Sequence, residues 1–310
     1  MKLTFLSYCP RSGSTKLAQM LSESVLALPE FRSAIWLIER NPTSHRYSSS
    51  EIQTLLSEDP QLSENLGLGG EDISAIATRC AGWSGVDIVR EIVRLWCERQ
   101  SVDEPASVLL KVGRMVEVAD EVMGSDSAVS MLFLVRDPRA VILSMATTVV
   151  PRDPRSGTFS RGSGTYSARL WLKRLRAFCR LQESFVDRCH LVRFEDLADP
   201  LVIDVVADFV GRADATPELS ISSVEESLHP NVHAQFDRGH NEKWRSGLPR
   251  KTVRRSEILC RREMIELGYE LDDPMLPSVL ERAASGIASA SSVPLSMVQR
   301  GRTVIAGRYR

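Results

Sequence analysis

Short apolar runs alternate along the chain with longer stretches in which apolar residues recur at helical spacing. The short runs predict β-strands at residues 3–8, 106–112, 131–135 and 190–194. The helical spacing predicts helices at residues 15–28, 86–98, 138–149, 166–187, 201–210 and 251–267. Strands that alternate with helices are typical of a parallel sheet whose faces are covered by helices. We therefore expect an α/β fold with a central parallel sheet flanked by helices.

The stretches between these elements differ in composition and indicate the domain organisation. Residues 29–85 are rich in Ser, Pro and Gly, which predicts short helices joined by loops. Residues 151–164 combine arginines with glycines, which predicts an irregular basic loop. Beyond residue 273 the chain turns small and polar and ends on basic residues. The sequence thus predicts one domain over residues 1–272, followed by a tail or peripheral arm over residues 273–310.

Composition and charge narrow the class of protein. Of the 310 residues, 43% are apolar, which is enough for a substantial core. The 39 Lys and Arg residues balance 40 Asp and Glu residues, and this near-neutral charge argues against a general nucleic-acid binder. No apolar run is long enough to span a bilayer, and the first residues are too few for a signal-peptide core.

The six cysteines also bear on the compartment. They are widely scattered and form no C-x-x-C pair, so neither a zinc site nor a disulfide scaffold is indicated. We expect a cytoplasmic protein with reduced thiols that acts on a small molecule, with no nucleic-acid partner and no membrane partner.

The first predicted strand runs directly into a loop and a helix with the residues of an anion site. Gly13 lets the backbone approach a ligand closely, while Ser14 and Thr15 add hydroxyl donors at the start of the helix. Arg11 adds a permanent positive charge whose planar group can bind an anion through two hydrogen bonds. This strand–turn–helix geometry favours phosphate binding. The alternative is an ordinary turn with a Ser or Thr cap.

The loop differs from that of nucleotide kinases and NTPases. Their motif is G-x-x-x-x-G-K-[ST], in which a lysine follows the second glycine. Here Tyr8 lies five residues before Gly13, and Ser14 stands where that motif has its lysine. The cation, Arg11, comes before the glycine instead. A kinase or NTPase of similar fold is therefore an alternative that fails at two required positions.

A second candidate anion site follows the predicted strand at residues 131–135. Arg136 ends that strand, and Asp137 and Pro138 suit the cap and the first position of a helix. Ser144 lies about two turns into this helix, where its hydroxyl and the Arg136 side chain could share one ligand. The alternative is a helix cap beside a surface arginine.

Both segments resemble motifs of the sulfotransferases. Residues 10–15, PRSGST, are similar to the family's 5′-phosphosulfate loop, Pro-(Lys/Arg)-Ser-Gly-(Ser/Thr)-(Ser/Thr). Residues 136–144 are similar to its 3′-phosphate motif, Arg-Asp-Pro-Arg-Ala-Val followed by Ser, especially in the carbohydrate-acting and bacterial branches. The resemblance covers roughly residues 3–268, and it implies a fold like that of P-loop nucleotide kinases.

The resemblance also implies a donor and the residues that bind it. The family's donor is 3′-phosphoadenosine 5′-phosphosulfate (PAPS), its product is 3′-phosphoadenosine 5′-phosphate (PAP), and no metal is required. The two motifs would bind the donor through Arg11, Ser12, Gly13, Ser14, Thr15, Lys16, Arg136 and Ser144. Lys16 stands where the cytosolic enzymes often have an aromatic residue that stacks on adenine, which puts that packing in doubt.

Three shorter segments are weaker matches. Phe194 begins the segment FEDL, which resembles a family segment whose aromatic lies near the adenine; the alternative is a core aromatic that closes a strand. Arg238 and Gly239, followed by Trp244, resemble the segment of cytosolic sulfotransferases that wraps the 3′-phosphate; the alternative is an ordinary basic loop. Residues 252–257 resemble part of a dimerisation motif without its lysine, which leaves a homodimer open.

Catalytic residues are also implied by the resemblance. Arg11 would stabilise the charge that grows on the leaving oxygen. Lys111, at the end of a predicted strand, would contact the sulfonate as the strand lysine of the family does, or is a solvated strand-end lysine. The family's catalytic histidine, where present, follows that lysine by two positions, and this chain has Gly113 there.

An acceptor hydroxyl requires a general base. Carbohydrate-acting and many bacterial members use a glutamate in the loop after the first helix, and Glu30 fits that place. Glu39 and His45 are nearby rivals, and a glutamate in a loop can also be merely solvated. Arg114 is a further candidate contact on the acceptor or donor side.

Together these features predict a sulfotransferase that moves a sulfonate from PAPS to a hydroxyl or amine of a small polar metabolite, sugar or natural product. One alternative is a P-loop-type kinase or NTPase. The other is a catalytically silent module that retains the nucleotide site.

Overall fold

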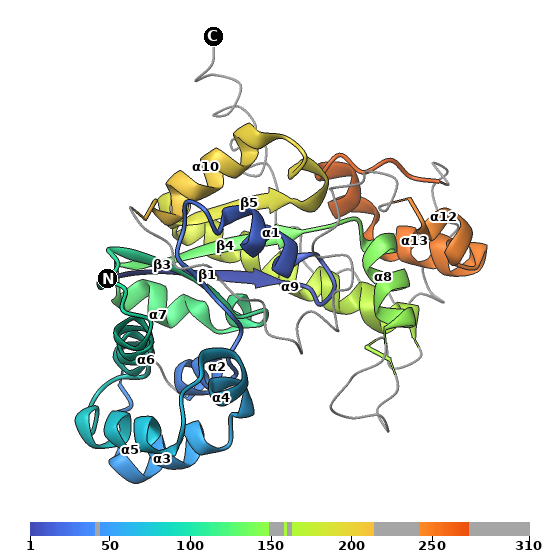
Figure 1. The fold of residues 1–310 in the computed structure, drawn as a ribbon. Coiled ribbons are helices and arrows are strands. Elements are labelled where there is room, and N and C mark those ends of the chain that lie inside the picture. The colour runs from blue at the N-terminus through green and yellow to red at the C-terminus, as the bar shows by residue number, and fades with distance from the viewer. Residues whose placement is uncertain (41–43, 149–157, 160–162, 214–241, 273–310) are drawn as a thin grey trace.

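The computed structural model describes residues 1–40, 44–148, 158–159, 163–213 and 242–272. At its centre is a five-stranded sheet in which all neighbouring strands are parallel. The strands are β1 (Lys2–Tyr8), β2 (Ala27–Leu28), β3 (Ser107–Lys111), β4 (Val129–Val135) and β5 (Cys189–Arg193). Their order is β2-β3-β1-β4-β5, so the first strand lies in the middle (Figure 1). The predicted α/β fold with a central parallel sheet is confirmed.

Helices cover both faces of the sheet (Figure 1). One face carries α1 (Ser14–Leu21) and α10 (Pro200–Val210). The other face carries α2 (Ser33–Glu39), α6 (Gly85–Arg99), α7 (Ala119–Ser125) and α9 (Gly164–Ser184). This double cover is the physical reason for the continuous apolar runs, because a parallel strand in the middle of such a sheet has no face in water.

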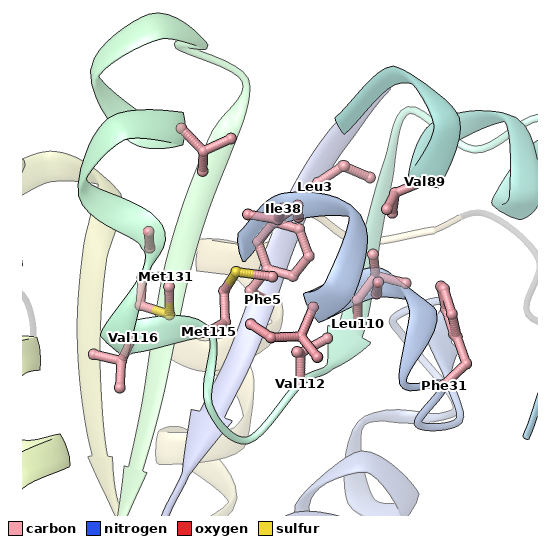
Figure 2. Close-up of a cluster of buried hydrophobic side chains, with 14 of the residues drawn as sticks. Leu3, Phe5, Phe31, Ile38, Val89, Leu110, Val112, Met115, Val116 and Met131 are labelled. Atoms are coloured by element: carbon pink, nitrogen blue, oxygen red, sulfur yellow. The ribbon is translucent and has the colours of Figure 1, made fainter. Parts of the chain in front are cut away.

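Successive residues of a strand supply the two cores in turn. Phe5 of β1 belongs to the core beneath α9, and its neighbour Leu6 belongs to the core beneath α1 and α10. Both are fully buried. Figure 2 shows the first core, where Phe5 gathers with Ile38 of α2 and with Met115. Burial of side chains of this size contributes about 1.5–3 kcal/mol each to folding.

Short helices fill the chain between β2 and α6, as the sequence predicts for residues 29–85. Besides α2 they are α3 (Ser49–Ser57), α4 (Pro60–Leu66) and α5 (Gly70–Arg79). Ser48 and Glu51 form a reciprocal cap at the start of α3. Asp59 caps α4 and also accepts the backbone N–H of Ser33 at 2.6 Å, which ties α4 to α2. These caps fix the helices that follow β2.

The remaining described elements connect or follow the later strands of the sheet. They are η1 (Met115–Glu117), α8 (Pro138–Thr147), η3 (Val186–Arg188), η4 (Phe194–Asp196), α12 (Trp244–Gly247) and α13 (Arg250–Glu266). Asp137 caps α8 by accepting the backbone N–H of Arg139 at 2.8 Å, and Pro138 occupies the first turn. The predicted start of this helix is confirmed.

One predicted element is wrong in part. The helix expected over residues 15–28 ends at Leu21, and Ala27 and Leu28 form β2. These two residues pair with Leu109 and Leu110 of β3 and are buried. The apolar residues at the end of the expected helix are therefore buried because they form an additional strand of the sheet, and they do not lie on a helix.

Other predictions fall where the structure gives no description. The tail at residues 273–310, the residues Arg238 and Gly239, and most of the basic loop at residues 151–164 lie outside the described residues. All six cysteines are buried as free thiols. Among the described helices, none is long and apolar enough to cross a membrane.

Candidate functional site

The two predicted anion motifs meet at the carboxyl edge of the sheet. β1 and β4 are neighbours, and Tyr8 at the end of β1 is in register with Leu134 of β4. Parallel strands end at the same edge, so the loop before α1 lies beside the junction between β4 and α8. The site is assembled from these two strand–helix junctions, from the last residue of β3 and from residues that follow β2 and β5.

The loop between β1 and α1 has the backbone of an anion cradle. Arg11 and Gly13 both have positive φ angles, 70° and 94°, which turn the chain sharply into α1. Gly13 is the N-cap of α1, and no side chain caps the helix. A helix start without a side-chain cap directs backbone N–H groups and the positive end of the helix dipole at a ligand. The backbone therefore fits a phosphate or sulfonate group.

Position 13 also requires glycine because the ring of Phe194, the residue after β5, packs against it. A Cβ atom built at Gly13 would lie 2.2 Å from Cε2 of Phe194, closer than side chains approach one another. Phe194 follows β5 at the start of η4, so its ring packs directly on the loop. The structure thus brings Phe194 to the predicted site. Its contact with adenine stays a prediction.

Arg136 joins this loop to the second motif. Its guanidinium lies over the Phe194 ring at 4.5 Å, and its Nη1 donates to the Arg11 carbonyl at 3.4 Å. Arg11 in turn donates from Nε to the Ser144 hydroxyl at 3.2 Å. The residues predicted to bind two separate phosphates are therefore in contact. A ligand with two anionic groups could engage both sets at once.

The electrostatics of this pair favour an anion. Burial lowers the pKa of Arg11, and the nearby charge of Arg136 lowers it further. Burial also lowers the pKa of Arg136, against the opposing effect of Glu195. Two guanidinium groups held close in a partly buried site repel one another, and a bound phosphate relieves that repulsion. The guanidinium groups of Arg11 and Arg136 thus place positive charge beside the loop, where it would favour binding of an anion.

Lys111 and the loop hydroxyls lie beside this charge. Lys111 is buried at the end of β3, and its Nζ donates to the Thr15 hydroxyl at 3.1 Å. Ser14 is buried at the start of α1. Ser12 is buried too, and its hydroxyl has no hydrogen-bond partner among the described residues. Lys16 points along α1, where it donates to Gln19 at 3.3 Å, and burial lowers its pKa.

Glu30 lies on the β2 side of the same edge. Its Oε2 accepts a hydrogen bond from the Tyr8 hydroxyl at 2.9 Å. The rival candidates have ionic partners, because Glu39 pairs with Arg114 at 2.7 Å and His45 contacts Glu51 at 3.3 Å. Glu30 is thus the carboxylate that the structure links to the phosphate loop, through the last residue of β1.

Sequence reasoning missed the buried network that supports Arg136. Arg139 is buried between Asp137, at 2.7 Å, and Glu257 of α13, at 2.5 Å, and its guanidinium stacks over Trp244 at 3.8 Å. Trp171 of α9 donates from its ring to the Arg136 carbonyl at 2.9 Å. The only signal in the sequence was the motif itself, because every partner except Asp137 is distant along the chain.

Glu195 is a second buried support for the same junction. It accepts the backbone N–H of Asp137 at 2.9 Å and the hydroxyl of Tyr269 at 2.9 Å. Burial raises the pKa of Glu195 and holds the pKa of Tyr269 well above its usual value. Glu257, which the sequence placed in a segment resembling a dimerisation motif, is buried against Arg139 within the chain.

A groove on another part of the surface contains no predicted site residue. An open groove of about 470 Å³, lined by Met1, Trp83 and Arg90 among others, lies next to the amino end of β1. It is at the opposite edge of the sheet from the predicted anion site and contains none of the predicted site residues. In the part of the chain that the structure describes, no group of three His, Cys, Asp or Glu side chains could hold a metal.

Comparisons with known proteins address the fold. No family model and no curated protein matches the sequence. The chain is similar to a solved sulfotransferase domain from the curacin biosynthetic pathway, with a TM-score of 0.55 and 19% identity over 87% of this chain and 98% of that domain. It is also similar to the sulfotransferase domain of the Synechococcus PCC 7002 olefin synthase, with a TM-score of 0.52 and 22% identity over 87% and 95%. The chain therefore has the fold of sulfotransferase domains.

Proposed function

We propose that this chain, which has the fold of sulfotransferase domains, transfers a sulfonate group from PAPS to a hydroxyl or amine of a small polar metabolite, sugar or natural product. The observation that carries the proposal is the contact between two anion sites at one sheet edge. Arg11 bonds to Ser144, and Arg136 bonds to the carbonyl of Arg11. PAPS is a ligand of this form, since it carries a 5′-phosphosulfate and a separate 3′-phosphate.

The donor would lie across the two strand–helix junctions. Its 5′-phosphosulfate would occupy the loop formed by Arg11, Ser12, Gly13, Ser14 and Thr15. Its 3′-phosphate would bind Arg136 and Ser144. The positive φ angles of the loop and the uncapped start of α1 support the first assignment. The buried guanidinium of Arg136 supports the second.

Transfer would proceed in line at sulfur. The acceptor oxygen forms a bond to sulfur while the bond from sulfur to the bridging oxygen of the 5′-phosphate breaks. That bridging oxygen keeps the electron pair, so PAP leaves with the additional negative charge. Arg11 and Lys111 would stabilise this charge, and removal of one such contact costs on the order of 10²–10³ in rate. Glu30 would accept the proton of the acceptor.

A kinase is less well supported by the same residues. The position of the first glycine of its phosphate loop holds Tyr8, whose hydroxyl is bonded to Glu30. The lysine that would follow Gly13 is Ser14. A silent nucleotide-binding module is disfavoured because Lys111 and Glu30 both reach the edge of the loop, through Thr15 and Tyr8.

Calorimetry with three nucleotides tests the donor. We expect PAP to bind, adenosine 5′-phosphate to bind more weakly, and ATP with Mg²⁺ to bind no better than adenosine 5′-phosphate. Arg136→Ala and Ser144→Ala should lower the affinity for PAP, on the order of tenfold or more for the arginine, and leave adenosine 5′-phosphate unaffected. Equal losses for both ligands would make these residues structural, and preference for ATP with Mg²⁺ would favour the kinase.

A further inference from the structure

We propose that Tyr8 is a positioning residue that orients the Glu30 carboxylate, and that Gly113 provides the space through which it does so. The inference rests on the proposed function, because it assigns a partner to the base of that reaction. Two observations support it. The Tyr8 hydroxyl donates a hydrogen bond to Glu30 Oε2 at 2.9 Å, and the geometry of the sheet allows the Tyr8 side chain to reach Glu30.

The order of the strands separates the two residues. Tyr8 ends β1 and Glu30 follows β2, and β3 lies between those strands. Neighbouring strands are about 4.8 Å apart, so the two backbones are separated by roughly 10 Å. A long side chain must therefore cross the end of β3 to join them. Tyrosine has the length and the rigidity to do this with a polar group at its tip.

Gly113 is the residue that the Tyr8 ring crosses. A Cβ atom built at Gly113 would lie 3.2 Å from Cε2 and 3.3 Å from Cζ of the Tyr8 ring. The Tyr8 backbone N–H donates to the Gly113 carbonyl at 3.3 Å, so the two backbones cannot separate easily. A side chain at position 113 would crowd the ring by a few tenths of an ångström. Glycine at this position keeps the path from β1 to Glu30 open.

Both ends of the bridge are fixed by the scaffold. The Tyr8 carbonyl accepts a hydrogen bond from Arg174 Nη1 at 2.6 Å, and Arg174 is held by Glu117 at 3.1 Å. The Tyr8 side chain is only 8% exposed. The Glu30 carbonyl accepts from the Asn65 side chain at 2.7 Å. The Glu30 side chain is thus held at both ends, by its anchored backbone and by the Tyr8 hydroxyl.

The bond to Tyr8 also distinguishes the two carboxylate oxygens. Oε2 is occupied by the Tyr8 hydroxyl, whereas Oε1 has no hydrogen-bond partner among the described residues. Oε1 would take the proton of the acceptor as the acceptor oxygen bonds to sulfur and the bridging oxygen leaves with its electron pair. Positioning of this kind matters because misplacement of a reacting group by about 1 Å can cost on the order of 100-fold in rate.

The test uses PAPS with water as the acceptor, so that no other acceptor need be known. The measured quantities are the release of PAP, as kcat and as KM for PAPS, and the affinity for PAP by calorimetry. Tyr8→Phe keeps the ring and removes the hydroxyl, and we expect kcat to fall on the order of 10- to 100-fold. KM for PAPS and PAP affinity should stay unchanged. In a Glu30→Gln background, Tyr8→Phe should have no further effect.

Two further variants complete the design. Tyr47→Phe is the matched control, because the buried Tyr47 hydroxyl donates to the Leu37 carbonyl at 2.8 Å, away from the loop, and its loss should leave kcat unchanged. Gly113→Ala keeps the Tyr8 hydroxyl but crowds its ring, and it should lower kcat in the same direction as Tyr8→Phe.

The outcomes separate the inference from the proposed function. If wild type releases PAP and Tyr8→Phe keeps its kcat, the positioning role is overturned. It is also overturned if Tyr8→Phe loses PAP affinity in proportion to kcat, since Tyr8 would then support the loop, or if it lowers kcat equally in the Glu30→Gln background. If wild type releases no PAP above the uncatalysed rate, either with water or with a panel of hydroxyl and amine acceptors, the proposed function itself fails, and the inference fails with it.

Discussion

The contact between Gly13 and Phe194 gives the sharpest prediction for the site. Gly13→Ala adds one methyl group at a residue with φ of 94°, 2.2 Å from Cε2 and 2.4 Å from Cδ2 of Phe194. The positive φ costs about 1–2 kcal/mol of folding free energy for a residue with a Cβ. The steric overlap adds on the order of 1–3 kcal/mol, because the Arg136 guanidinium lies over the ring at 4.5 Å. We expect a loss of roughly 2–5 kcal/mol in all.

The assay is urea unfolding of four variants beside wild type. Gly82→Ala is the matched control, since Gly82 has φ of 85° and a Cβ atom there would meet nothing within 4 Å. Its loss of stability reports the cost of the positive φ angle alone, about 1–2 kcal/mol. Like Gly13→Ala, it also lowers the conformational entropy of the unfolded chain, so that effect cancels in the comparison. Phe194→Leu and the double variant with Gly13→Ala complete a cycle, in which the smaller side chain should recover most of the steric cost.

The same variants report on the ligand. A displaced Phe194 ring moves the Arg136 guanidinium, so Gly13→Ala should also lose PAP affinity, which Gly82→Ala should keep. A Gly13→Ala protein as stable as Gly82→Ala would refute the steric argument. A double variant that recovers none of the stability lost in Gly13→Ala would show that Phe194 does not limit the loop.

Three further predictions follow from the contacts described. Arg11→Ala should lower kcat on the order of 10²–10³ with the fold intact by circular dichroism, because the loop cation stabilises the leaving group; near wild-type turnover would remove it from the mechanism. Lys111→Met, which loses the bond to Thr15, should lower kcat while PAP still binds, and unchanged kcat would make Lys111 structural. Burial lowers the pKa of His190 to about 4, so the unfolded chain binds more protons between pH 6.5 and 4. The free energy of unfolding should therefore fall as pH drops through this range, and His190→Gln should make it fall less steeply in urea titrations. If the free energy of unfolding depends on pH equally in both proteins, His190 is not the cause.

Much of the fold follows from local sequence pattern. The runs that form β1, β3 and β4 are buried almost throughout because both faces of the sheet are covered, and a pattern of that kind is visible in one sequence. β2 was missed because it has two residues, too few for a periodic signal, and they follow directly on helical spacing.

The site was predictable to a different extent. Arg11, Gly13, Arg136 and Ser144 lie in motifs whose spacing carries the chemistry, and the structure brings them together. The partners of these residues were not predictable, because the contact of Phe194 with Gly13 joins residues that are far apart in the chain. The order of strands across the sheet decides such contacts, and a single sequence does not reveal it.

Group transfer itself tests the central claim most directly. PAPS labelled with ³⁵S in the sulfonate is incubated with the protein in the presence of EDTA and a panel of hydroxyl and amine acceptors, beside Arg11→Ala. The account predicts that label appears in one class of acceptor in a one-to-one ratio with PAP, and that Arg11→Ala forms neither above the uncatalysed rate. PAPS that is left intact by the wild-type protein with every acceptor and with water, while ATP with Mg²⁺ is consumed, would contradict it.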